Sequence, residues 1–107
     1  PRRGARLRQL DKMTGAVRTV EVPAGEEIRL DRLAIRLAAC EAPEDGAVNG
    51  TRAFLQIRDT GVEGEELAFS GWMFADSPAL SAMDHRRYDV WVISCTMSAG
   101  GVSSGSE

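Results

Sequence analysis

The two cysteines, Cys40 and Cys95, constrain this 107-residue chain more than any other feature of its sequence. Each lies at the end of an apolar run typical of a β-strand, Leu33–Cys40 and Val90–Cys95. The chain has no Cys-x-x-Cys motif. Two distant cysteines and a single histidine do not supply the four ligands of a closed zinc site. The two remaining explanations are a disulfide and a pair of buried free thiols.

A disulfide would contribute a large share of the stability of such a small domain. It would close a loop of about 56 residues, to which the chain-entropy model assigns about 4 kcal/mol. Whole domains are typically stable by only about 5–15 kcal/mol. The sequence therefore favours a disulfide and an oxidising compartment. Two free thiols in a cytosolic protein remain the alternative.

The rest of the sequence predicts a mainly β fold. Alternation of apolar and polar residues over Val17–Val22 and Ala53–Arg58 is typical of strands. Asp11–Gly15 is typical of a hairpin loop, and Pro23–Glu26 of a turn. We expect a small single-domain β-sandwich or partly open barrel of about seven short strands, with these ranges: 5–10, 17–22, 27–30, 33–40, 53–58, 67–74 and 88–96.

One short helix is expected between the last two strands. Ser77 is a preferred N-cap residue, and Pro78 suits the first helical position of a helix over 79–83. We expect residues 5–97 to form a single β domain. Residues 1–4 would be a flexible N-terminal arm, and the Gly/Ser-rich residues 98–107 a disordered tail.

The charge pattern excludes one class of partner and suggests another. A net charge of -3 gives no broad attraction to nucleic acid. Basic residues gather near the start of the chain, where they are either a solvated end or a peripheral contact with lipid headgroups or an acidic partner. These residues are Arg2, Arg3, Arg6, Arg8 and Lys12. No apolar run is long enough for a transmembrane segment.

Two sets of residues could carry chemistry, and neither has a diagnostic spacing. Ser70, His85 and Asp89 are the residue types of a hydrolase triad, but the Gly-x-Ser-x-Gly elbow is absent. His85 and Met83, with Met73 and Met97, are the types that bind copper(I). Methionines more often fill cores, and a lone histidine is usually a hydrogen-bonded loop residue. We therefore expect no catalytic set, no resident metal and no cofactor.

Aromatic residues are the strongest local feature. Five of the six lie within Phe69–Phe74 and Tyr88–Trp91. They form either one core layer beside the disulfide or, in part, an exposed docking patch centred on Trp72 or Phe74, because aromatic side chains are enriched in interface hot spots. The candidate binding residues are Trp72, Met73, Phe74, Ser77, Pro78, His85, Tyr88 and Trp91.

Four segments together resemble a known family of small exported alphaproteobacterial proteins. These segments are Leu10–Gly15, Glu21–Gly25, Phe69–Leu80 and Tyr88–Cys95, with His85 between the last two. That family is catalogued as domain of unknown function 2155. The resemblance implies a signal peptide in the precursor, a periplasmic location and a disulfide-bonded cysteine pair, and it implies no enzyme activity. Arg86 follows His85, where the family usually has proline.

These observations lead to three functional hypotheses. The first is a non-enzymatic periplasmic binding or accessory module that docks on a protein of an envelope or inner-membrane complex. The second is a periplasmic small-ligand or copper/zinc carrier in which His85 and the methionines converge. The third is an envelope hydrolase in which Ser70 and His85 lie within hydrogen-bonding distance.

Overall fold

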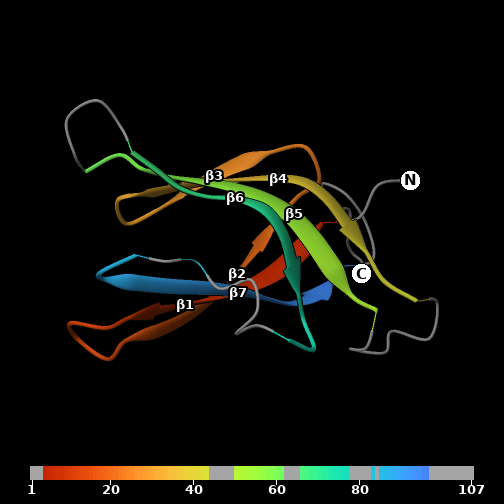
Figure 1. Ribbon diagram of the computed structural model, residues 1–107, viewed down its shortest axis with the longest axis horizontal. Coiled ribbons are helices and arrows are strands. Elements are labelled where there is room, and N and C mark those ends of the chain that lie inside the picture. The colour runs from red at the N-terminus through yellow and green to blue at the C-terminus, as the bar shows by residue number, and fades with distance from the viewer. Residues whose placement is uncertain (1–3, 44–49, 62–65, 78–82, 84, 97–107) are drawn as a thin grey trace.

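Seven antiparallel strands form two facing sheets in the computed structural model, which describes residues 4–43, 50–61, 66–77, 83 and 85–96. One sheet has the order β2-β1-β7 and the other β3-β4-β5-β6. Figure 1 shows the sheets as two layers. The strands are β1 (Ala5–Asp11), β2 (Val17–Val22), β3 (Glu27–Leu30), β4 (Leu33–Glu41), β5 (Arg52–Asp59), β6 (Glu66–Phe74) and β7 (Tyr88–Cys95). The predicted mainly β fold of about seven strands is confirmed, and its form is a sandwich.

Alternation along the strands places one apolar set between the sheets. In β1, the side chains of Ala5 and Leu7 are buried, whereas those of Arg6 and Arg8 are exposed. The same alternation in β5 buries Leu55 and its inward neighbours. Because successive side chains of a strand point to opposite faces, β1 and β5 contribute every second residue to the core. The fully buried large side chains include Leu33, Ile35, Leu37, Ile57, Val90 and Val92.

The disulfide joins the two layers. Cys40 in β4 and Cys95 in β7 are bonded, with their Cα atoms 5.8 Å apart. These strands belong to different sheets, so the bond is a covalent cross-link through the core. It confirms the predicted pairing, and it is consistent with a protein that resides in an oxidising compartment outside the cytoplasm.

The first hairpin turn follows the sequence prediction. The backbone N–H of Gly15 donates to the carbonyl of Asp11 at 2.7 Å, and Asp11 N–H donates to Ala16 at 2.9 Å. Gly15 has a φ of 79°, in the left-handed region that glycine adopts without steric cost. β1 and β2 then pair from Leu10–Val17 to Ala5–Val22.

Several predicted segments lie outside the described residues. These are residues 78–82, which hold Pro78 and most of the expected helix, residues 1–3 of the expected arm, and residues 97–107, which contain the expected tail. The described part of the chain contains no helix, and therefore none that could cross a membrane. Met83, within the connection from β6 to β7, is only 3% exposed and belongs to the core.

Candidate functional site

An aromatic cluster lies on the outer face of the four-stranded sheet. Phe54 of β5 is opposite Trp72 of β6, and Arg52 is opposite Phe74. The rings of Phe54 and Trp72 meet edge to face, with centroids 5.4 Å apart. The guanidinium carbon of Arg52 lies 4.3 Å from the centroid of the Trp72 ring, a cation–π contact. We call these four residues the aromatic patch.

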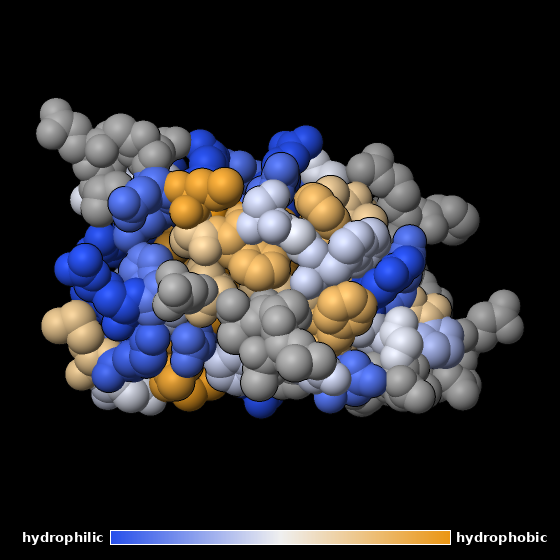
Figure 2. Space-filling view, in the orientation of Figure 1, coloured by the Kyte–Doolittle hydropathy of each residue, from blue (hydrophilic) through white to orange (hydrophobic). Residues whose placement is uncertain are grey.

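The patch faces away from the core. Its neighbours in the same strands, Ala53 and Met73, are buried between the sheets, so alternation directs Trp72 and Phe74 outward. Phe74 is 37% exposed, and Leu67, at the other end of β6, is 65% exposed. Figure 2 shows apolar residues reaching the surface on the side of the molecule where β6 lies.

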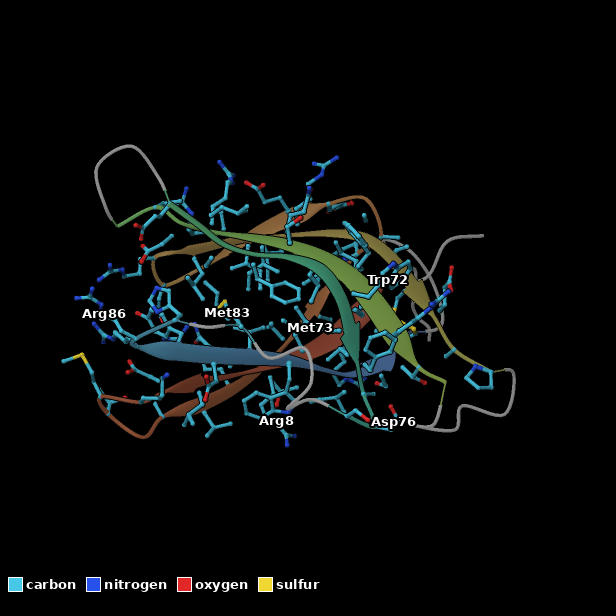
Figure 3. All side chains as sticks on the ribbon, in the orientation of Figure 1. Arg8, Trp72, Met73, Asp76, Met83 and Arg86 are labelled. Atoms are coloured by element: carbon cyan, nitrogen blue, oxygen red, sulfur yellow. A yellow bond between two sulfur atoms is a disulfide. The ribbon has the colours of Figure 1, made fainter. Side chains whose placement is uncertain are left out.

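The aromatic residues grouped by the sequence are separated by the structure. Tyr88 is buried in the core, and Trp91 is opposite the exposed Arg8 on the outer face of the other sheet. Met73 is only 2% exposed, and Figure 3 shows it between the layers with Met83. The alternative of one aromatic core layer is therefore wrong. Of the candidate binding residues that the structure describes, Trp72 and Phe74 share the patch.

A cluster of charged and polar side chains joins the two sheets at one end of the sandwich. Arg32, between β3 and β4, donates two hydrogen bonds to the Asp59 carboxylate, at 3.0 and 2.9 Å. Nε2 of His85 lies 2.8 Å from the same carboxylate. On the other sheet, Arg87 donates to both carboxylate oxygens of Asp11. We call these five residues the polar cluster.

Both ring nitrogens of His85 are engaged within the cluster. Nδ1 accepts the backbone N–H groups of Arg87 at 3.0 Å and Tyr88 at 3.2 Å. An accepting Nδ1 carries no proton, so the geometry assigns the ring proton to Nε2, which donates it to Asp59. No ring nitrogen is left for Ser70, and Asp89 instead forms an ion pair with Lys12 at 3.6 Å. Binding of a metal at His85 would require one of these bonds to break.

The arginines hold the two buried carboxylates in their ionised form. The hydrogen bonds from Arg87 lower the pKa of Asp11 to about 2, and the backbone N–H of Met13 adds to the effect. The hydrogen bonds from Arg32 lower the pKa of Asp59 well below its usual range, and His85 adds to that. Burial raises the pKa of the Tyr88 hydroxyl. The cluster is thus a set of mutually satisfied charges.

A cavity of about 450 Å³ opens beside the cluster. Leu67 and Ala68 contribute to its wall, and Glu66 and Arg86 line it as well. Its volume falls within the range of small-ligand sites. However, Asp59 and His85, the most buried polar groups that line it, are already bonded to Arg32, to each other and to the backbone. Across the described residues, no group of three metal-binding side chains occurs.

A family model described as an uncharacterized protein conserved in bacteria, DUF2155, matches residues 5–95. This chain belongs to the DUF2155 family. The match begins at the first residue of β1 and ends at Cys95, so it spans both sheets and the disulfide. No curated protein and no solved structure matches the chain. The family assignment therefore gives this DUF2155 domain no function.

In this DUF2155 domain, several residues of the aromatic patch and of the polar cluster carry no signal in the sequence pattern. Phe54 and Arg52 were not candidates, although Phe54 is the sixth aromatic residue and occupies an outward position of a predicted strand. Arg32 was expected in a tight connection between strands, and Asp59, the last residue of β5, was not singled out. Ser77, a candidate, has its backbone N–H bonded to the Phe74 carbonyl at 3.2 Å. Contacts between distant segments bring these residues together. Alternation within one strand does not reveal which residues of other segments become its neighbours.

Proposed function

We propose that this protein is a non-enzymatic binding module of the bacterial periplasm. It docks through the aromatic patch on a protein of an envelope or inner-membrane complex. The single observation that carries the proposal is the placement of Phe54, Trp72 and Phe74 with Arg52 on an outer sheet face. Tryptophan and arginine are enriched among the residues that dominate binding energies.

The patch is not needed to fill the core. The space between the sheets is occupied by aliphatic side chains, Met73, Met83 and Tyr88, with Phe69 packed against them. Trp72 and Phe74 have large apolar surfaces that a sheet face directed only at water does not require. The edge-to-face contact with Phe54 and the cation–π contact with Arg52 hold the Trp72 ring in place, which reduces the entropy lost on binding. These features support a preformed docking surface.

The polar cluster supports a structural role for the ionisable residues that would otherwise be candidates for catalysis. His85, Asp59 and Arg32 bind one another, and Asp11 binds Arg87. A nucleophile or base needs an unengaged atom directed at a substrate. The disulfide between the sheets supports an exported protein, and the periplasm is the oxidising compartment that we propose for this bacterial family.

A photo-crosslinking amino acid at Ser70 tests the proposal. Ser70 is exposed and lies next to Trp72 on the outer face, whereas Thr19 is exposed in β2 of the other sheet and serves as the matched control. In intact cells, we expect the probe at Ser70 to give one discrete protein adduct, which mass spectrometry identifies. The probe at Thr19 should not give that adduct.

The Trp72→Ala variant makes this test specific. It should abolish the adduct formed at Ser70 while the protein remains folded and exported. Equal adducts from Ser70 and Thr19, or an adduct that survives Trp72→Ala, would overturn the proposal.

A further inference from the structure

The face that carries the aromatic patch also carries a charged half. Beyond the patch, Arg36 of β4 is opposite Glu27 on one side and Gln56 on the other. Arg29 of β3 is opposite Ala34, which in turn is opposite Arg58. These positions lie on the same outer face, because their neighbours Ile35 and Ile57 are buried. Among the described strand residues of this face, four arginines stand against two glutamates, Glu27 and Glu41.

Ion pairing leaves two of the four arginines available. Arg58 donates to both carboxylate oxygens of Glu27 at 3.0 Å, and Arg52 binds Glu41 at 2.8 Å. Arg29 and Arg36 are exposed, and neither has a side-chain hydrogen bond or ion pair with any residue that the structure describes. They occupy diagonal positions on adjacent strands. The Cα atoms of such diagonal neighbours are about 7–8 Å apart. Two cations at this spacing are suited to binding a pair of carboxylates.

We propose that the occupant of this face is an acidic protein surface. It places carboxylates over Arg29 and Arg36 and an apolar side chain against Trp72 and Phe74. The inference rests on the proposed function, and it adds the chemistry of the partner. Since the whole chain carries a net charge of -3, an acidic partner is repelled in general and attracted at this face. Charge thus sets the orientation of docking.

The balance of charge favours a protein over a lipid surface as the occupant. Basic clusters that bind anionic membranes typically contain about four to eight Lys or Arg residues, whereas this face offers Arg29 and Arg36. Arg52 and Arg58 are neutralised by Glu41 and Glu27 and add little. Such an attraction does not hold a protein on a membrane without a deeply inserted apolar segment. A protein can instead place its carboxylates to match these two arginines.

Charge reversal tests the inference with the Ser70 crosslink as the readout. The double variant Arg29→Glu/Arg36→Glu should lower the crosslink yield at least about tenfold, because like charges across an interface are strongly unfavourable. Arg8→Glu reverses an exposed arginine on the outer face of the other sheet and should leave the yield unchanged. Circular dichroism and thermal unfolding confirm that each variant is folded.

Ionic strength gives a second readout on the unmodified chain. In isolated envelopes, the yield from Ser70 should fall as salt rises from about 0.1 to about 1 M, since the Debye length shortens from about 10 to about 3 Å. The crosslink of the Arg29→Gln/Arg36→Gln variant should depend less on salt. A salt-independent yield would contradict an acidic partner.

The outcomes separate this inference from the proposed function. A crosslink that is lost in Trp72→Ala but kept in Arg29→Glu/Arg36→Glu would overturn the acidic partner and leave the docking module intact. No specific crosslink at Ser70 would overturn both. Flotation of the purified protein with vesicles of phosphatidylethanolamine and phosphatidylglycerol, abolished by Arg29→Glu/Arg36→Glu, would identify a lipid surface and overturn the protein partner.

Discussion

At the scale of single residues, adjacent side chains of β6 point to opposite faces of the sheet. Met73 points between the sheets and is almost completely buried, whereas Trp72 points outward to Phe54 and Arg52. The Phe69–Phe74 string was identified as a candidate from sequence, but its division into inward and outward residues depends on strand pairing. Phe54, contributed by β5, could not be assigned to the patch without that pairing.

The contrast between Met73 and Trp72 predicts different losses of stability. Met73→Ala should lower the free energy of unfolding by about 2–5 kcal/mol, because it leaves a cavity in the core. Trp72→Ala should cost about 1–2 kcal/mol, since it removes a cross-strand ring pair and a cation–π contact. Urea denaturation measures both values. If Trp72→Ala were the more costly change, Trp72 would belong to the core and not to a docking surface.

The polar cluster predicts how stability depends on pH. The pKa of Asp11 is about 2 in the folded protein, below the ordinary value of about 3.9, and that of Asp59 is lowered as well. Between these values the unfolded chain binds more protons than the folded one, so stability falls as the solution is acidified. Stability should be nearly constant above about pH 5 and should decrease from about pH 4 towards pH 2.

The variant Asp11→Asn removes one of the responsible carboxylates. In this variant, the urea midpoint should fall less steeply as the pH is lowered from about 6 to about 2. The substitution should also lower stability near neutral pH, because Arg87 loses its ionised partner. An acid decrease as steep as that of the wild type would show that the Asp11–Arg87 pair contributes nothing to it.

At the scale of elements, strands were easier to predict than their partners. Alternation, turn residues and apolar runs located all seven strands to within about one residue of their observed bounds. Sheet membership depends on contacts between distant segments, which alternation within a strand does not encode. β6 and β7 belong to different sheets, so the outward side chains Trp72 and Trp91 lie on opposite surfaces. Sequence proximity had placed them in one candidate set.

The β1–β2 turn provides a test of an element that the sequence did predict. Gly15 has a positive φ, and a β-carbon at this position would meet no atom within 4 Å. Gly15→Ala should therefore cost about 1–2 kcal/mol through backbone strain alone. Gly15→Asn should cost less, because asparagine tolerates the left-handed region. Thermal unfolding of the wild type, Gly15→Ala and Gly15→Asn measures these differences. Equal stability of Gly15→Ala and wild type would contradict the assigned turn.

At the scale of the whole molecule, one disulfide and one polar cluster join the layers. The disulfide connects β4 to β7 within the core, and the charged side chains connect the sheets near Asp59 and Asp11. The cysteine spacing and the strand ends indicated the disulfide in advance. The polar cluster was not predicted, since its members come from four separate parts of the chain. A rigid sandwich presents its outer faces at fixed geometry, which suits a docking role.

Removal of the disulfide should weaken the whole domain. Cys40→Ala/Cys95→Ala should lower the free energy of unfolding by about 2–5 kcal/mol, since the 55-residue separation constrains the unfolded chain. Reduction of the native protein should raise its intact mass by about 2 Da and shift its urea midpoint in the same direction as the variant. An unchanged mass after reduction would contradict the bonded state.

The most direct test of the docking surface compares two tryptophans on opposite faces. Trp72→Ala and Trp91→Ala each remove an indole from an outer sheet face, and only the first belongs to the aromatic patch. The measurement is the yield of the Ser70 photo-crosslink in intact cells for each variant at matched protein levels. We predict loss of the crosslinked protein in Trp72→Ala and its retention in Trp91→Ala. Retention in Trp72→Ala, or equal loss in both, would contradict a docking surface on the four-stranded sheet.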